Sequence, residues 1–198
     1  MQFGAKLVIM GALLGSVGLS MGLYTLAADY SIVVAAAPKG NNVQSSIIEQ
    51  NASQAELAAD CQVSSHFPAN VLRWCGLITQ HASMKKLSPD LIAAVILQES
   101  GGSPQAYSHS GAVGLMQVMP RDGLAASFHC KNGPCFANRP TIKQLEDPAF
   151  NIAYGTEMLS NLVARNGNIR DALKSYGPMD VGYSYADKVL AHYQRLGN

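Results

Sequence analysis

The feature of this chain that most constrains its fold is an apolar helix that carries one carboxylate and runs into a glycine-rich loop. Ser88, Pro89 and Asp90 predict the start of the helix. Serine is a good N-cap, proline suits the first turn, and an acidic side chain favours the positive end of the helix dipole. Gly101 and Gly102 predict its end, since glycine accepts the left-handed conformation that terminates helices.

Glu99 falls on the apolar side of this predicted helix. At about 100° per residue it lies in the same sector as four aliphatic side chains, Leu91, Ile92, Val95 and Ile96. Burial beside them and the negative end of the helix dipole both disfavour the ionised carboxylate, so both raise its pKa. A general acid that works near neutral pH needs that environment. The alternative is a glutamate at the edge of the core that pairs with an arginine.

The residues from Glu99 onward form an ordered series of short motifs. The series is Glu99-Ser100, Ser108-x-x-Gly111-Ala112, Gly114-Leu115-Met116-Gln117, Asn151-Ile152-x-x-Gly155-x-x-Met158-Leu159, Ser175-Tyr176 and Tyr185-Ala186-x-x-Val189. In this order, from about Asn70 to Leu196, the chain resembles the lytic transglycosylase catalytic domain of the lysozyme-like superfamily. Within that group it is similar to the soluble lytic transglycosylases of glycoside hydrolase family 23.

The resemblance implies a reaction on the glycan strands of peptidoglycan that needs neither a metal nor another cofactor. Glu99 is expected to protonate the β-1,4 glycosidic oxygen between N-acetylmuramic acid and N-acetylglucosamine, while the substrate's own N-acetyl group stabilises the intermediate. Glu99 then removes the proton of the sugar's 6-hydroxyl, which gives a 1,6-anhydromuramoyl end without water. Tyr176 is expected to hydrogen-bond near Glu99 and the reacting sugar, and the other residues expected to line or support the groove are Ser108, Met116, Gln117 and Asn151.

Two of these expected substrate-binding residues also have a structural interpretation. Met116 could simply fill the core, and Asn151, inside a predicted helix, could make a structural hydrogen bond. Gln117 and Tyr176 are favoured as site residues, because polar groups in an otherwise apolar motif need a partner.

Two further hypotheses stay open beside the lytic transglycosylase. A hydrolytic muramidase of the lysozyme type requires a second carboxylate opposite Glu99. The remaining carboxylates lack a context that marks one as that partner, and they include Asp122, Glu157 and Asp180. A catalytically weak peptidoglycan-binding assembly module is motivated by two departures from the family pattern. Gly177 stands where the family usually has asparagine, and Ser103 where it often has asparagine.

Residues 1–37 predict export. They contain two charged side chains, and residues 7–26 are uncharged and mostly apolar. Such a segment is either a signal peptide, cut near residue 27 or 28, or an uncleaved membrane anchor. Lys6 on the short leading side places the remainder outside the cytoplasm. We therefore expect a periplasmic, secreted or inner-membrane-tethered protein that meets the membrane only through this segment.

The rest of the chain predicts a polar tether, residues 38–60, and one domain, residues 61–198. The tether is rich in Asn, Gln, Ser and Ala with little apolar patterning. The domain is expected to be mainly helical, lysozyme-like and built around a substrate groove, since no segment longer than a few residues has the strand period. Besides the helix that carries Glu99, the predicted elements are helices at 68–83, 147–165, 171–176 and 183–196 and a loop excursion at 123–145 beside the groove.

The charge of the chain bears on its partners. A net charge of +1 with 14% charged residues indicates no nucleic-acid surface, so hydrogen bonds and stacking are expected to hold the substrate. The layout of export segment, tether and domain suggests local wall opening for an envelope-spanning secretion, conjugation or pilus machinery.

Four cysteines, Cys61, Cys75, Cys130 and Cys135, favour disulfides in an exported chain. Three pairings are possible. Cys130 and Cys135 flank the turn sequence Lys-Asn-Gly-Pro, so a local bridge is easy to close, which leaves Cys61 to reach Cys75. The alternative is a zinc site beside His129, although the spacing lacks the usual Cys-x-x-Cys pairs.

Overall fold

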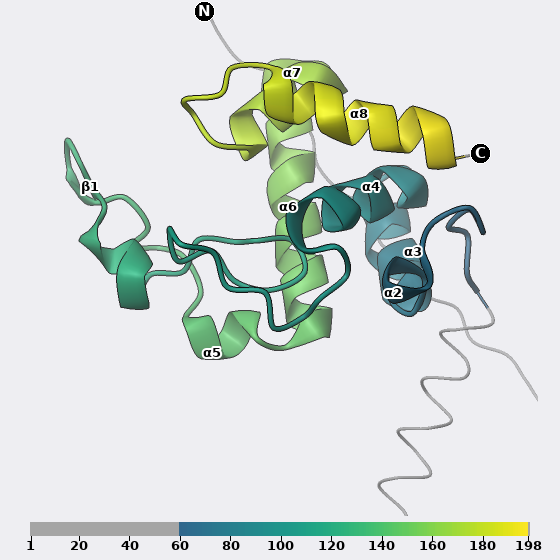
Figure 1. Cartoon of the computed structure of the whole chain (residues 1–198). Coiled ribbons are helices and arrows are strands. Elements are labelled where there is room, and N and C mark those ends of the chain that lie inside the picture. Colours follow the sequence, from purple (N-terminus) through teal and green to yellow (C-terminus); the bar gives the residue numbers. More distant parts are fainter. Residues whose placement is uncertain (1–59, 198) are drawn as a thin grey trace, which may run out of the picture. The chain divides into compact units, whose positions relative to one another are not determined.

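The computed structural model describes residues 60–197, which are mainly helical, as predicted (Figure 1). The predicted export segment and all of the tether but its last residue lie in residues 1–59, outside the described part. Within residues 60–197, no helix combines the length and the apolar character that crossing a membrane requires. The α-helices described there are α2 (Ala69–Leu72), α3 (Cys75–Met84), α4 (Pro89–Ser100), α5 (Ile142–Leu145), α6 (Pro148–Asn166), α7 (Ile169–Tyr176) and α8 (Ser184–Leu196).

Helix α4 is the most deeply buried element, and it begins and ends where the sequence predicts. Its residues from Leu91 to Ile96 are all 0% exposed. Ser88 has the extended backbone of an N-cap, although its side chain makes no capping hydrogen bond, and Gly101 ends the helix with a φ of 59°. Helices α3 and α8 pack against it, so the last turn of α4, which carries Glu99, is fixed from both sides.

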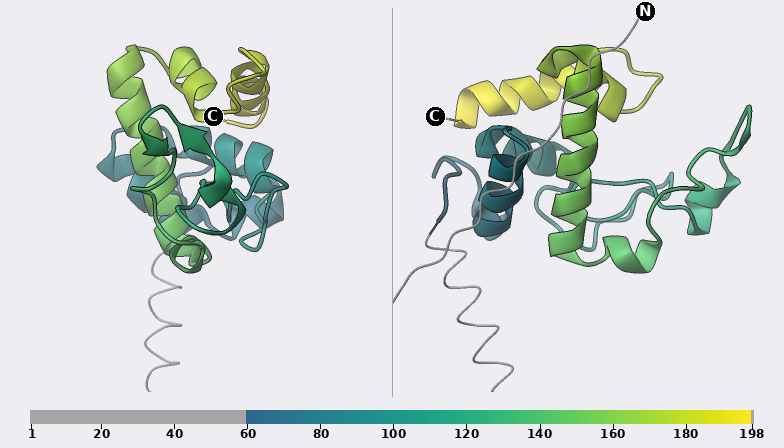
Figure 2. Two further views of the ribbon diagram at one scale, coloured as in Figure 1. Left: turned by 90° about the vertical axis from the view of Figure 1, so that its left-hand side faces the viewer. Right: turned by 180° about the vertical axis from the view of Figure 1, so that it is seen from behind.

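Helix α6 is the longest described helix, and it packs on α3, α5 and α7. The Asp147 side chain accepts a hydrogen bond of 2.7 Å from the backbone N–H of Phe150, which caps its start. Gly167, with a φ of 76°, ends it. Figure 2 shows α6 from two sides, running between α5 and α7. The predicted helix at 147–165 is therefore confirmed to within one residue, and those at 171–176 and 183–196 to within two.

The single helix predicted at 68–83 is wrong, because the chain breaks between α2 and α3. Trp74 leaves the helical conformation, with a φ of −99° and a ψ of 6°. Its indole N–H donates a 3.0 Å hydrogen bond to the carbonyl of Gly102, just beyond α4. At Gly102 a Cβ would lie only 2.3 Å from the carbonyl oxygen of Asn70 in α2. The break therefore lets α2 lie directly against the end of α4.

The excursion at 123–145 contains a short disulfide-closed hairpin. A 3-10 helix (Gly123–Ser127) leads into the antiparallel strands β1 (His129–Cys130) and β2 (Gly133–Pro134). A disulfide joins Cys130 to Cys135, as predicted. The hairpin projects from the helices (Figure 1). Its place beside a substrate groove stays a prediction.

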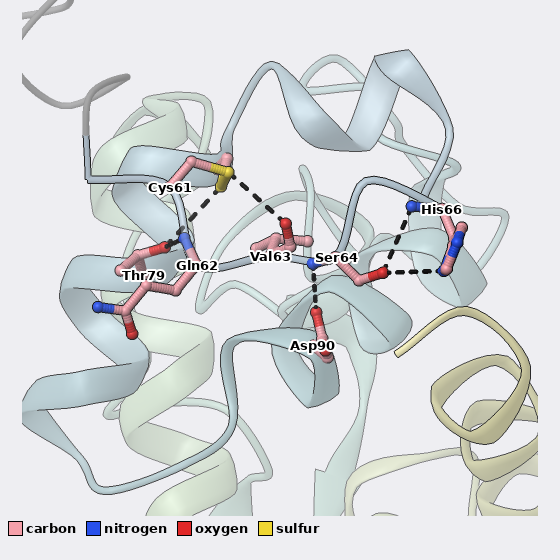
Figure 3. The surroundings of a disulfide bond; sticks show 8 residues. Cys61, Gln62, Val63, Ser64, His66, Thr79 and Asp90 are labelled. Atoms are coloured by element: carbon pink, nitrogen blue, oxygen red, sulfur yellow. Dashed lines mark hydrogen bonds between the residues drawn. A yellow bond between two sulfur atoms is a disulfide. The ribbon is translucent and has the colours of Figure 1, made fainter. Parts of the chain in front are cut away.

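The second disulfide joins Cys61 to Cys75 at the start of α3, as predicted, so none of the four thiols is left to bind zinc. Figure 3 shows the segment that follows Cys61 lying against α3 and α4. The backbone N–H of Gln62 donates to Thr79 Oγ1 at 3.0 Å, and that of Ser64 donates to Asp90 Oδ1 at 2.7 Å. The segment at 61–64, with which the domain begins, is thus held to α3 by the disulfide and the Gln62 hydrogen bond, and to α4 by the Ser64 hydrogen bond.

Removing the Cys61–Cys75 disulfide is expected to destabilise the protein more than removing Cys130–Cys135. In the chain-entropy account a disulfide restricts the unfolded chain, and the two bridges span sequence separations of 14 and 5 residues. The expected losses are about 3 and about 2 kcal/mol. Denaturant unfolding of the two double serine variants measures both, and a larger loss in the hairpin variant would contradict this ranking.

Candidate active site

Glu99 lies partly buried in the last turn of α4 and receives a hydrogen bond from a tyrosine. The Tyr185 hydroxyl, from α8, donates to Glu99 Oε1 at 2.5 Å. The salt bridges among residues 60–197 are Lys85–Glu157 and Arg170–Asp187, so Glu99 is in neither of them. The structure therefore places Glu99 on the apolar side of its helix, as predicted, and does not support the alternative of a pair with arginine.

The surroundings of Glu99 favour its protonated form. Burial raises the pKa of its carboxyl from 4.5 to about 7, and the hydrogen bond from Tyr185 opposes that rise. A carboxyl with a pKa of about 7 can give and take a proton near neutral pH. This is the property that a general acid and base requires.

Two stacked tyrosines adjoin Glu99. The rings of Tyr176, at the end of α7, and Tyr185 lie 6.4 Å apart between centroids with an interplanar angle of 16°. Burial raises both phenol pKa values, and the charge of Glu99 raises them further, so both hydroxyls remain proton donors. Tyr176 donates to the backbone carbonyl of Met116 at 2.9 Å. Tyr185, and not Tyr176, is thus the tyrosine bonded to Glu99.

The sequence motif Tyr185-Ala186-x-x-Val189 carried no predicted role for Tyr185 at the site. Tyr185 is 6% exposed, on the buried face of α8. The motif does not show which group the Tyr185 hydroxyl contacts. The available signal was the hydroxyl itself, since a buried Tyr O–H needs a partner.

Asn151 holds the glycine-containing loop at 113–118 in place. Its side chain is 0% exposed. It accepts a hydrogen bond from the Met116 N–H and donates to the carbonyls of Val113 and Leu145, all at 2.9 Å. Gly114, with a φ of 79°, allows this approach, because a Cβ there would lie 2.2 Å from Asn151 Nδ2. The structural interpretation of Asn151 is therefore the one that its contacts support.

Met116, Gln117 and Ser108 also have defined contacts in this loop region. The Met116 side chain is 0% exposed, and a Cβ at Gly155 would lie 2.6 Å from its sulfur.

Gln117 has a φ of 45°, rare for a residue with a side chain, and its Nε2 donates to the carbonyls of Ala106 and Gly114 at 3.1 and 3.0 Å. Ser108 Oγ accepts from the Ala112 N–H at 2.8 Å. Substrate contact by these residues stays a prediction.

The other carboxylates considered from the sequence have roles of their own or lie in solvent. Asp122 Oδ1 accepts a 2.8 Å hydrogen bond from the Ile142 N–H, Glu157 pairs with Lys85, and Asp180 is exposed between α7 and α8. None of the three is bonded to Glu99. Among residues 60–197, no group of three or more His, Cys, Asp or Glu side chains could hold a metal ion.

Comparison with known proteins identifies a family whose model matches the part of the chain that carries Glu99. The model of the family described as "Transglycosylase SLT domain" matches residues 76–182. Membrane-bound lytic murein transglycosylase E of Buchnera aphidicola is 38% identical over 89 residues, which are 45% of this chain and 39% of the relative.

Two other relatives match a similar share of the chain. Endo-type membrane-bound lytic murein transglycosylase A of Klebsiella pneumoniae is 34% identical over 91 residues, 46% of this chain and 43% of the relative. A transglycosylase of Enterobacteria phage PRD1 is 32% identical over 108 residues, 54% of this chain and 36% of the relative. The chain thus matches less than half the length of each relative.

Proposed function

Because the chain belongs to the transglycosylase SLT domain family, we propose that it is a peptidoglycan lytic transglycosylase with Glu99 as its catalytic residue. The family model matches residues 76–182, which include α4 with Glu99, the loop at 113–118, α6 and α7, and which end before α8. The observation that carries the assignment is the partly buried Glu99 carboxyl, whose pKa is raised to about 7. The bond cleaved is the β-1,4 link between N-acetylmuramic acid and N-acetylglucosamine.

In the proposed reaction, Glu99 acts first as acid and then as base. Protonated Glu99 gives its proton to the glycosidic oxygen as the bond from that oxygen to C1 breaks. The Glu99 carboxylate then takes the proton of the 6-hydroxyl as O6 bonds to C1, which restores the acid and forms the 1,6-anhydro ring. The substrate's N-acetyl group stabilises the cationic C1 between the two steps, so one carboxylate suffices.

Tyr185 fits this cycle through its hydrogen bond to Glu99 Oε1. A donor stabilises the carboxylate more than the neutral acid, so it favours the ionised state that exists between the two steps. The phenol pKa is raised by burial and by the Glu99 charge, so Tyr185 keeps its proton throughout. We assign it the stabilisation of Glu99, with Glu99 alone transferring protons.

The proposed substrate-binding region is the loop segment at 108–118. It is joined to the end of α4 by the 2.8 Å hydrogen bond from Ser100 Oγ, next to Glu99, to the Leu115 carbonyl. Asn151 and Met116 support it from the buried side, while Ser108 and Gln117 are partly exposed in it. Tyr176 links it to α7 through the Met116 carbonyl. We propose that the loop carries the sugar contacts of Ser108 and Gln117 and that the other three hold its shape.

The products released from purified sacculi test the proposed function. Mass spectrometry is expected to find muropeptides with 1,6-anhydromuramoyl ends. Reducing ends would instead support the hydrolytic muramidase, and no soluble product would support the catalytically weak wall-binding module. Either of those results overturns the proposal.

The rate of cleavage is expected to fall as pH rises through about 7. The first step needs protonated Glu99, and above its pKa of about 7 the protonated fraction falls about tenfold per pH unit. The pH dependence of kcat/KM on solubilised glycan strands measures this from about pH 6 to about pH 9. A rate that stays constant or rises across that range would contradict a general-acid role for Glu99.

We propose that the protein acts in the cell envelope, where it opens the wall locally for an envelope-spanning secretion, conjugation or pilus machinery. Support comes from the predicted export segment and tether and from relatives whose names include "membrane-bound". Cell fractionation tests this location. Recovery of the protein in the cytoplasmic fraction would contradict it.

A further inference from the structure

We propose that Gly177 is a positioning residue whose lack of a side chain sets the Tyr185 ring against Glu99. Gly177 directly follows α7, and the Tyr185 ring comes from the first turn of α8. The proposal rests on the proposed function in one respect only, the catalytic role of Glu99. The packing on which it stands is independent of that role.

The space at Gly177 is filled by Tyr185. A Cβ added there would lie 2.4 Å from Tyr185 Cγ, 2.5 Å from Cδ1 and 2.9 Å from Cβ. These are the atoms at the root of the ring, so the ring cannot avoid the new carbon by moving its far end alone. Gly177 has a φ of −73° and a ψ of −176°, a backbone conformation open to any residue. The constraint is therefore the space that Tyr185 occupies, and not backbone strain.

A shift at the root of the ring is transmitted to its hydroxyl. Carbon atoms in contact lie about 3.5 to 4.0 Å apart, so relieving the overlap requires the ring to move by about 1 Å. The Tyr185 hydroxyl donates to Glu99 at 2.5 Å, and hydroxyl hydrogen bonds extend to about 3.0 Å. The stack on Tyr176, the residue before Gly177, restricts the direction in which the ring can move. A methyl group at 177 is therefore expected to separate Tyr185 from Glu99.

Few ionisable groups lie near enough to Glu99 and Tyr185 to affect the titration of Glu99. Tyr185 and Tyr176 interact with Glu99, and Arg139 acts on Tyr176 in turn. Helix α3, which also packs on α4, carries His81 and is followed by Lys85, which pairs with Glu157. The test variants below keep all of these groups except the Tyr185 hydroxyl.

The direct test is the titration of Glu99 by carboxyl-carbon NMR in four proteins: wild type, Gly177→Ala, Tyr185→Phe and the double variant. The hydrogen bond from Tyr185 lowers the Glu99 pKa, so its loss raises that pKa. Each single variant is expected to raise it by about one unit. The double variant is expected to match Tyr185→Phe, because both changes remove the same bond.

Gly197→Ala is the matched control. A Cβ there would lie 2.6 Å from the Tyr193 carbonyl oxygen and 3.2 Å from Asp90 Oδ2, at the opposite end of α4 from Glu99. It is expected to lower Tm and to leave the Glu99 titration unchanged. If Tyr185→Phe shifts the titration and Gly177→Ala does not, the proposal is overturned. The NMR titration needs no cleavage, so a protein that cleaves no wall would overturn the proposed function and leave this test intact.

If Gly177→Ala fails to fold, the proposal is tested by adding the same substitution to a variant that lacks the Tyr185 ring. In a Tyr185→Ala background the ring is gone, so adding Gly177→Ala is expected to lower Tm only slightly. If adding Gly177→Ala in that background still abolishes folding or lowers Tm strongly, the methyl group meets something other than the ring. That result also overturns the proposal.

Discussion

Replacing Glu99 with glutamine is expected to lower the rate of wall cleavage by at least about 10²-fold while the protein still folds and binds the wall. Glutamine keeps the shape of the side chain and an oxygen that accepts from the Tyr185 hydroxyl, but it has no acidic proton. The measurement is release of soluble muropeptides from purified sacculi at equal concentrations of folded protein. Cleavage at a near wild-type rate would exclude Glu99 as the acid.

The same variant is expected to be more stable than the wild type at neutral and alkaline pH. Burial raises the Glu99 pKa from 4.5 to about 7, so between these values the folded protein holds a proton that the unfolded chain has lost. The wild type therefore loses stability as pH rises from about 4.5 to about 7, by about 3 kcal/mol in all. Glutamine does not ionise, so its advantage grows across this window and then stays constant.

Glu157→Gln is the matched control for this prediction. Glu157 is an exposed carboxylate paired with Lys85, and this pair lowers its pKa. Its replacement is expected to leave cleavage unchanged and to change stability little, because exposed ion pairs contribute little. A lower Tm together with normal cleavage in Glu99→Gln would instead indicate that Glu99 has a structural role.

Asn151→Ala is expected to destabilise the protein by about 3 kcal/mol or more. The change removes the partner shared by the Met116 N–H and the carbonyls of Val113 and Leu145, of which the Val113 carbonyl keeps a 3.1 Å hydrogen bond from the Val118 N–H. Each buried group left unpaired costs about 1 to 3 kcal/mol, and partial repacking offsets some of the sum. Denaturant unfolding gives the loss in free energy.

Asn161→Ala, on the exposed side of the same helix, is the control. Asn161 donates one 3.3 Å hydrogen bond to Glu157, so its loss is expected to change stability by less than about 0.5 kcal/mol. Equal effects of the two substitutions would contradict the structural role of Asn151. Wild-type stability combined with weaker substrate binding in Asn151→Ala would point instead to direct sugar contact.

Local sequence signals predicted those parts of the fold that depend on neighbouring residues. Gly101 ends α4 in the left-handed conformation, as predicted, and the helix predicted at 147–165 is present as α6, capped by Asp147 and ended by Gly167. The turn between Cys130 and Cys135 likewise favoured a bridge of short span. In each case the residues that decide the structure lie within a few positions of one another.

Contacts between distant parts of the chain were harder to predict. The break at Trp74 depends on Gly102, which is 28 positions away, and the bond from Tyr185 to Glu99 spans 86 positions. Periodicity shows which face of a helix is buried, but it does not show which side chain the face meets. For Asn151 the sequence allowed either a structural or a substrate contact, and only the folded loop supports the first.

Cleavage of purified peptidoglycan in water enriched in oxygen-18 tests the central claim most directly. A lytic transglycosylase closes the ring with the sugar's own O6, so the products are expected to carry no oxygen-18 and to be lighter by one water than the hydrolysis products. A muramidase bonds water oxygen to C1. Oxygen-18 at the newly formed muramic acid ends, produced by wild-type protein and not by Glu99→Gln, would contradict the account.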